Sequence, residues 1–220
     1  MFQPLTEWRV LKNRSDLHLA RKVWHLTSVF SVFLFFQLAP TSASAFALFI
    51  IGPIAVAIDF LRLRSEKVNE SVVAIMGPIM RNQEVKGLAG TTYLISGVAL
   101  IFLIFPKPVV ALSILFLAFA DPIASYVGIR YGRERIVGNK TLQGFLAALL
   151  VCFILTLIYI YEPGMGLSRA LVISILGGII GALAELAPMG KLDDNFTMPV
   201  LSACGLYVLF LLFDMTAQLS

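Results

Sequence analysis

The residues best suited to chemistry are five acids that lie in or beside apolar stretches. Asp121 lies in the middle of a long apolar run, and Glu185 ends another. Asp59 ends a third, and Asp193 and Asp194 share a loop. An ionisable group at membrane depth is costly unless it faces a polar cavity, so a buried acid there indicates a functional site. Carboxylates beside a basic loop can bind Mg²⁺ and, through it, phosphate oxygens, which predicts a site for an anion.

Some of these acids also have an ordinary structural interpretation. Asp193 and Asp194 could be solvated loop residues, and Asp59 could pair with Arg62 one helical turn later. The residue types leave both interpretations open at these three positions. Asp121 and Glu185 lie too deep in apolar sequence for either explanation.

Small and polar residues follow Asp121 at helical spacing. Ser125, Gly128 and Gly132 lie on the helix face that carries this acid. The two glycines would let a ligand approach the backbone closely, but they would equally serve a packing seam between two spans.

A second face of this kind is formed by Gly177, Gly181 and Glu185, which recur every four residues. Two faces of small residues, each carrying a carboxylate, suggest a cleft between two helices.

A polar turn, Gly138-Asn139-Lys140-Thr141, precedes a further apolar stretch. It would place backbone N–H groups, a lysine and a hydroxyl at a helix N-terminus, where anions bind. The spacing of a P-loop is absent. The alternative is that Thr141 only caps the helix and Lys140 only orients the span.

His25 lies one turn after Arg21 and Lys22 on one helix face near the start of the first apolar stretch. In this position it could bind a phosphate, move a proton, or simply anchor the helix at the membrane interface.

Membrane spans must position all of these residues. The chain of 220 residues is 59% hydrophobic and 14% charged, whereas soluble domains are about 45–50% apolar. Seven stretches approach or reach the ~17–25 residues that cross a bilayer. They run from Val23 to Leu38, Ala43 to Ile58, Leu88 to Phe105, Val109 to Ile129, Leu142 to Tyr161, Ala170 to Leu186 and Phe196 to Phe213. The predicted fold is an all-α integral membrane bundle of about seven transmembrane helices.

The basic residues predict the orientation of this bundle. Fifteen of the 17 Lys and Arg residues fall on one set of alternate segments and two on the other. By the positive-inside tendency, the N-terminus and the five acids are cytoplasmic and the C-terminus is outside. Residues 1–22 then form a cytoplasmic segment, 23–213 a single transmembrane catalytic domain and 214–220 a tail. The segment from Val68 to Met80 resembles an interfacial or re-entrant piece. No soluble basic domain is present, so no nucleic-acid partner is expected.

The run from Asp121 to Gly132, DPIASYVGIRYG, followed by GNKTLQG from Gly138 to Gly144, resembles the CTP-binding sequence of the polyprenol kinase family. This family includes dolichol kinase, phytol kinase and CTP-dependent diacylglycerol kinase. Further matches are Arg21-Lys22-Val-Trp-His25, Arg81-Asn-Gln-Glu84 and Asp193-Asp194-Asn195. The chain departs from the family at Gln143, where the family has a glutamate, so a metal or base role is not carried over to that position.

The resemblance implies a membrane lipid kinase with a cytoplasmic active site in the plasma or inner membrane. It would transfer the γ-phosphate of CTP, with Mg²⁺, to the hydroxyl of an isoprenoid alcohol or of diacylglycerol. The implied metal ligands are Asp121, Asp193 and Asp194. The implied nucleotide-binding residues are Arg21, Lys22, Ser125, Gly128, Gly132, Gly138, Asn139, Lys140, Thr141, Gly144 and Asn195. The implied catalytic residues are Asp121, with Glu185, Asp59 or His25 as acid–base candidates.

Two other functions stay open at this point. Phosphatidate cytidylyltransferase also uses CTP and Mg²⁺, but its lipid attacks the α-phosphorus. A secondary transporter of an anionic solute would also need intramembrane acids and glycine-interrupted helices. The sequence leaves the acceptor lipid and the oligomeric state undetermined.

Overall fold

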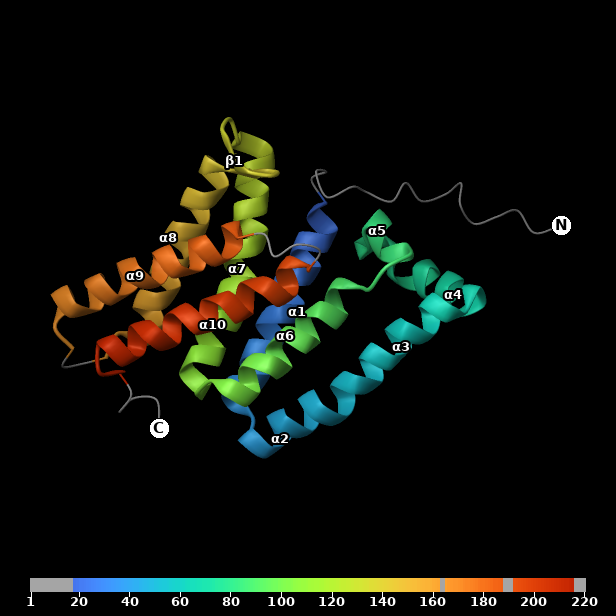
Figure 1. Ribbon diagram of the computed structural model, residues 1–220, viewed down its shortest axis with the longest axis horizontal. Helices are drawn as coiled ribbons and strands as arrows, with labels where there is room; N and C mark the ends of the chain where they lie inside the picture. Colours follow the sequence, from blue (N-terminus) through green and yellow to red (C-terminus); the bar gives the residue numbers. More distant parts are fainter. Residues whose placement is uncertain (1–17, 163–164, 188–191, 216–220) are drawn as a thin grey trace.

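The computed structural model describes residues 18–162, 165–187 and 192–215, and these residues are almost entirely helical (Figure 1). The helices that match single predicted stretches are α1 (Leu19–Leu38), α6 (Gly90–Ile104), α7 (Lys107–Tyr131), α8 (Leu142–Ile160), α9 (Leu167–Leu186) and α10 (Asp194–Leu212). The remaining stretch is a continuous helix made of α2 (Thr41–Phe46), a π-helical turn η2 (Ala47–Ile51) and α3 (Gly52–Arg64). The prediction of an all-α polytopic membrane protein is confirmed.

Short elements connect the long helices. Between α3 and α6 lie α4 (Glu66–Met76), the 3₁₀ turn η3 (Gly77–Ile79) and α5 (Asn82–Val85). Between α7 and α8 lies a hairpin of β1 (Arg135–Val137) and β2 (Lys140–Thr141), which the sequence analysis described only as a turn.

Six helices of the described residues, with 19 to 25 residues each, are long and apolar enough to cross a membrane. The seventh, α6, has 15 residues, which is fewer than the ~17 that a full crossing requires. Its passage through the whole bilayer stays a prediction.

The contacts between helix ends fit a chain that crosses a membrane back and forth. In such a chain, the starts of α1, α6 and α10 and the end of α7 lie on the same side. Lys22 near the start of α1 contacts Ser125 near the end of α7. Asn195 at the start of α10 contacts Gly90 at the start of α6. The side of the membrane stays a prediction. Most of the predicted N-terminal segment and C-terminal tail lies outside the described residues.

Helix α7 is the axis of the bundle. Its residues 109–118 are all buried, and α1, α6, α8, α9 and α10 pack around it (Figure 1). A helix that is apolar on all sides is typical of a protein core or of a membrane span, and α7 is both buried and long enough to span. The C-terminal half of α7, with Asp121, therefore extends from the centre of the protein toward one end.

The predicted cleft between the two helix faces forms where their carboxylates Asp121 and Glu185 line one cavity, but it does not extend along the glycines of α9. A Cβ atom on Gly177 would lie 2.6 Å from Oγ1 of Thr156, and one on Gly181 would clash with Cys152. Both partners belong to α8, so the glycines let the two helices pack closely. Only Glu185, at the end of this face, reaches a cavity.

Helices α3 and α4 form an outer edge of the molecule, on the side of α6 away from α8 and α9 (Figure 1). The predicted interfacial segment, from Val68 to Met80, comprises most of α4, all of η3 and Met80. Val72 and Met76, four residues apart on α4, face the interior of the molecule.

Candidate functional site

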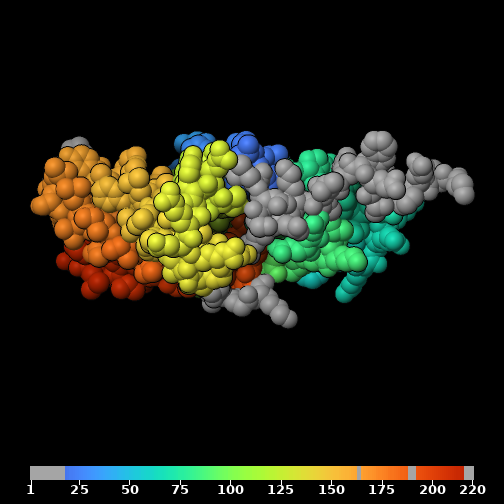
Figure 2. Space-filling model, turned by 90° about the horizontal axis from the view of Figure 1, so that it is seen from above, coloured from blue at the N-terminus to red at the C-terminus, as the bar shows by residue number. Residues whose placement is uncertain are grey.

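A cavity of about 330 Å³ lies where α1, α7, α9, α10 and the hairpin meet, and it is called here the polar cavity. Figure 2 views this end of the molecule, where a hollow lies beside the hairpin. Fifteen of the 17 predicted site residues line the cavity: Arg21, Lys22, His25, Asp121, Ser125, Gly128, Gly132, Asn139, Lys140, Thr141, Gly144, Glu185, Asp193, Asp194 and Asn195. The two that do not line it are Asp59 and Gly138.

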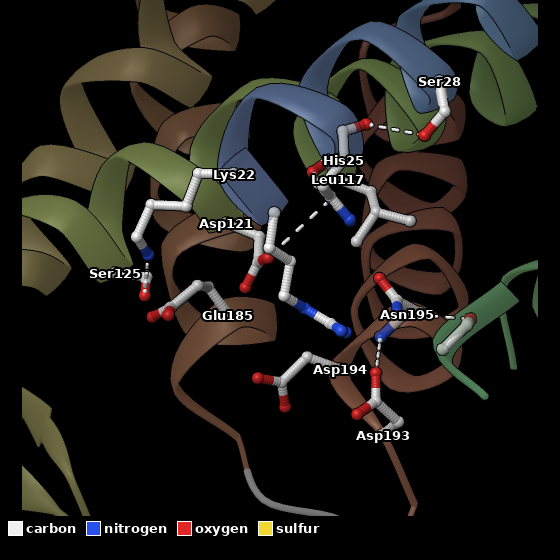
Figure 3. Close-up of polar contacts among 12 residues, drawn as sticks. Lys22, His25, Ser28, Leu117, Asp121, Ser125, Glu185, Asp193, Asp194 and Asn195 are labelled. Carbon is white, nitrogen blue, oxygen red and sulfur yellow. Dashed lines mark hydrogen bonds and ion pairs between the residues drawn. The ribbon is translucent and has the colours of Figure 1, made fainter. Parts of the chain in front are cut away.

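Asp121 lies beside His25 of α1, and Lys22 of the same helix reaches Ser125 (Figure 3). The Oδ2 of Asp121 lies 3.8 Å from Nε2 of His25. The same ring nitrogen lies 3.0 Å from the carbonyl oxygen of Leu117 and donates to it in the tautomer that this contact requires. Lys22 donates a hydrogen bond to Ser125, one turn after Asp121. The start of α1 therefore brings a histidine and a lysine beside the part of α7 that carries Asp121.

Lys140 connects the hairpin to two other helices. Its Nζ forms an ion pair with Glu185 of α9 and lies 3.4 Å from Oδ2 of Asp194 at the start of α10. Burial disfavours the charged ammonium, but the carboxylates of Asp194 and Glu185 outweigh burial and raise the pKa of Lys140 above its usual 10.5. The lysine is therefore a permanent cation at neutral pH.

Asp193 is the N-cap of α10. It accepts a hydrogen bond from the backbone N–H of Asn195 at 3.1 Å and one from Arg81 at 3.1 Å. The Asn195 side chain donates to the carbonyl oxygen of Gly90 at 3.2 Å. Asp193 is 9% exposed, so its interpretation as a solvated loop residue is wrong.

Arg81 is a cation of the polar cavity that was not among the predicted site residues. Its backbone N–H donates to Glu84 at 3.1 Å, and Glu84 also pairs with Arg21 at 2.7 Å. The run from Arg81 to Glu84 already matched the family in sequence, and this match was the signal that could have identified it.

Asp59 lies apart from the other acids. Its carboxylate accepts from Nε of Arg62 at 2.6 Å, from the backbone N–H of Ala89 at 2.9 Å and from Oγ1 of Thr92 at 2.6 Å. The predicted pairing with Arg62 is confirmed. Asp59 lines a second cavity that borders the first, and it does not line the cavity that holds Asp121.

The glycines of α7 allow the hairpin to lie directly on this helix. A Cβ atom on Gly132 would lie 2.6 Å from Cγ2 of Thr141, and one on Gly128 would lie 3.0 Å from Oγ1 of the same residue. Thr141 also caps α8 by accepting from the N–H of Gly144 at 3.2 Å, as predicted. The packing interpretation therefore describes the contacts of the glycines, although both still line the cavity.

The tip and base of the hairpin have their own local contacts. Gly138 has a φ of +54°, which only glycine adopts readily, and this conformation reverses the chain. Gln143 accepts from the backbone N–H of Arg133 at 3.0 Å. The residue that departs from the family pattern thus holds the hairpin in place.

The polar cavity therefore collects charges of both signs from α1, α7, α9, the start of α10, the hairpin and the segment that contains Arg81. Among the described residues, no three His, Cys, Asp or Glu side chains are close enough to hold a metal ion. Mg²⁺ that arrives on a nucleotide needs only one or two protein carboxylates, because phosphates and water supply the other ligands. Asp121 and the acids around Lys140 fit that requirement.

The sequence is similar to several characterised and uncharacterised proteins. It is 30% identical over 145 residues to CTP-dependent diacylglycerol kinase 1 of Schizosaccharomyces pombe, covering 61% of this chain and 66% of that protein. It is 31% identical over 166 residues to CTP-dependent diacylglycerol kinase 1 of Saccharomyces cerevisiae, covering 66% and 57%. An uncharacterized protein of Rickettsia prowazekii is 30% identical over 193 residues, covering 86% and 92%.

The chain spans roughly half to two thirds of the length of the fungal kinases. The matched regions cover 54% to 66% of those proteins. No protein-family model matches the sequence. No solved structure matches it.

Proposed function

This chain belongs to the same family as its rickettsial relative and the fungal CTP-dependent diacylglycerol kinases, and we propose that it is itself a membrane lipid kinase. It would transfer the γ-phosphoryl group of CTP to the hydroxyl of a lipid alcohol. Diacylglycerol is the first acceptor to test because the fungal relatives carry its name, and an isoprenoid alcohol is the second. The observation that carries the proposal is the convergence of fifteen predicted residues on one cavity.

The cations of the polar cavity would bind the triphosphate. Lys22, Arg81 and Lys140 come from three separate elements and line the same space. Each is engaged with an oxygen of the protein: Lys22 with Ser125, Arg81 with Asp193, and Lys140 with Glu185. A triphosphate carries more negative charge than the hydroxyl or carboxylate that each cation contacts in this structure, and its oxygens can accept charge-assisted hydrogen bonds from all three cations. Nucleotide binding would therefore exchange these contacts for contacts to phosphate.

Carboxylates that line the polar cavity would bind Mg²⁺ together with the phosphates. Asp121, Asp193 and Asp194 are the proposed ligands, of which one or two suffice for a nucleotide-bound ion. The ion would neutralise charge between the β- and γ-phosphates. The protein would contribute position and electrostatic stabilisation, which account for most of the catalysis in phosphoryl transfer.

His25 is the acid–base candidate that the geometry favours. Glu185 is paired with Lys140, and Asp59 already accepts three hydrogen bonds. His25 lines both cavities and lies beside Asp121. We place the reaction on the cytoplasmic side, because the basic segments that contain Arg81 and Lys140 carry most of the positive charge of the loops.

Labelled CTP tests the proposal on the purified protein in detergent or nanodiscs. CTP labelled at the γ-phosphate should yield a labelled lipid phosphate and CDP, while CTP labelled at the α-phosphate should leave the lipid unlabelled. With phosphatidate supplied in a parallel reaction, a cytidylyltransferase would give the opposite pattern, because the lipid phosphate takes the labelled α-phosphorus and pyrophosphate leaves. Absence of lipid label from either nucleotide, with diacylglycerol and with phytol or a longer prenol, would contradict a kinase and favour a transporter.

A further inference from the structure

A second cavity of about 230 Å³ lies between α1, α3, α4 and α6, and it is called here the lateral cavity. We propose that it binds the acceptor lipid alcohol, with the hydroxyl at the polar cavity and the tails in the bilayer. This inference rests on the proposed kinase function and adds the place where the acceptor binds.

The two cavities share a wall. Arg21, His25 and Asn195 line both of them. Of these, His25 has its Nε2 3.8 Å from the carboxylate of Asp121 (Figure 3). A hydroxyl held at this wall from the lateral side would face a phosphate held from the polar side. In-line transfer requires this opposition of acceptor and donor.

The lining of the lateral cavity combines polar and apolar side chains, as a lipid alcohol combines a hydroxyl group with hydrocarbon tails. Its polar part includes Arg21, whose guanidinium is paired with Glu84 at 2.7 Å. Its apolar part includes Trp24 of α1 and Ile58 of α3, each 50% exposed on the outside of the bundle. Exposed apolar side chains on two candidate spans face hydrocarbon, so a tail can leave the cavity there without meeting water.

The volume shows how much of a lipid the cavity can hold. Sites that enclose a whole drug-sized ligand measure about 300–1,000 Å³, and this cavity measures about 230 Å³. It therefore accommodates a headgroup and the first carbons of its tails, and the remaining carbons stay in the membrane. Selection would then act on the hydroxyl-bearing end of the lipid.

Buried polar contacts hold the walls of this cavity in place. Arg62 is 2% exposed and donates to Asp59, to Oδ1 of Asn69 at 3.1 Å and to the carbonyl oxygen of Gly87 at 2.8 Å. These contacts join the end of α3 to α4 and to the segment before α6. Asp59 is therefore a positioning residue for the lateral cavity.

Two neighbouring residues of α3 provide a matched pair of variants. Ala55 lines the cavity and Ile54 does not, because Ile54 is 57% exposed on the outside of the helix. Ala55→Trp should fill the cavity and raise the KM for diacylglycerol about tenfold or more, while the affinity for CTP stays unchanged. Ile54→Trp should leave both values unchanged. Equal KM values for the lipid in the two variants would overturn the proposal.

Photo-crosslinking of the unaltered protein gives a test that no variant can confound. Diacylglycerol with a diazirine next to the glycerol should label peptides of α1, α3, α4 or α6, and unlabelled diacylglycerol should compete. A phytol probe in a parallel sample distinguishes the two acceptor classes. Label confined to α8 and α9 would overturn the lateral site while leaving kinase activity intact. Failure of the proposed function would instead appear as no transfer from γ-labelled CTP.

Discussion

The imidazole Nε2 of His25 lies 3.8 Å from the carboxylate Oδ2 of Asp121, although α1 and α7 are separated by a third of the chain. The contact occurs at the wall shared by the polar and lateral cavities. Asp121 is the acid that lies deepest within an apolar stretch of the sequence. Among the described residues, His25 is the only histidine that lines both cavities.

Asp121→Asn should keep the fold and lower kcat with CTP and Mg²⁺ about 10²- to 10³-fold, the range seen when one stabilising group is removed from a transition state. The amide has the size of the carboxylate but not its charge, so it cannot neutralise or bind a cation equally well. Steady-state turnover and CTP binding with and without Mg²⁺ measure the effect. Wild-type values for both would instead assign Asp121 a packing role.

His25→Gln should lower kcat more than it raises the KM for CTP, since the imidazole is proposed to act on the acceptor hydroxyl. General acid–base groups contribute about 10²- to 10⁴-fold. The pH dependence of kcat should also lose one ionisation in the variant. An increase in KM for CTP with unchanged kcat would show that His25 only helps to bind phosphate.

Lys140→Met should mainly raise the KM for CTP, by about tenfold or more, because a charge-assisted hydrogen bond contributes ~1.5–3 kcal/mol. Lys107→Met is the matched control, since Lys107 lies at the other end of the bundle near Gln37. The control should bind CTP as the wild type does. Loss of the Lys140 cation also leaves Glu185 buried without its partner, so thermal unfolding should be measured on the same samples.

The raised pKa of Lys140 predicts how activity responds to alkaline pH. Its folded-state pKa lies above 10.5, so the stability from its ion pairs is complete below that value and is lost only as the pH rises through the higher pKa. Between about pH 7 and 10, Lys140→Arg should therefore give the same shape of kcat/KM profile as the wild type. An alkaline decrease below about pH 10 that disappears in the arginine variant would contradict the assignment.

Residues that carry charge in apolar sequence could be predicted to form the site. Asp121 and Glu185 converge on one cavity with Lys140 of the polar turn, because a buried charge is stable only beside polar partners. The roles of Gly177 and Gly181 could not be predicted, because a smooth helix face serves a cleft and a packing seam equally well. Only the neighbours on α8 distinguish the two.

Three other features depend on contacts that a sequence pattern does not contain. The hairpin has strands of three and two residues, which are too short for a periodic signal. Arg81 lies in a run that matched the family, but its place in the site depends on an ion pair with Asp193, which is remote in sequence. The lateral cavity depends on Ala55 and Ile58, which look like any other apolar residues of a span.

Asp59→Asn distinguishes a structural acid from a catalytic base. Removing one partner of a buried ion pair costs ~3–5 kcal/mol, because the other charge remains buried without compensation. The variant should therefore unfold at a lower temperature and raise the KM for the lipid, with little change in the KM for CTP. A large loss of kcat without loss of thermal stability would assign Asp59 the role of the base.

Cysteine accessibility tests the orientation on which the cytoplasmic placement of the site depends. Glu134, in the loop between α7 and β1, and Ser168, near the start of α9, are both exposed and lie at opposite ends of the bundle by the predicted topology. In a background with Cys152→Ala and Cys204→Ala, a membrane-impermeant maleimide should label Ser168→Cys in intact cells. It should label Glu134→Cys only after the membrane is opened, because fifteen of 17 basic residues place that loop inside. The reverse pattern would move the polar cavity to the outer surface, where it would have no access to cytoplasmic nucleotide, and would contradict the kinase proposal together with the topology.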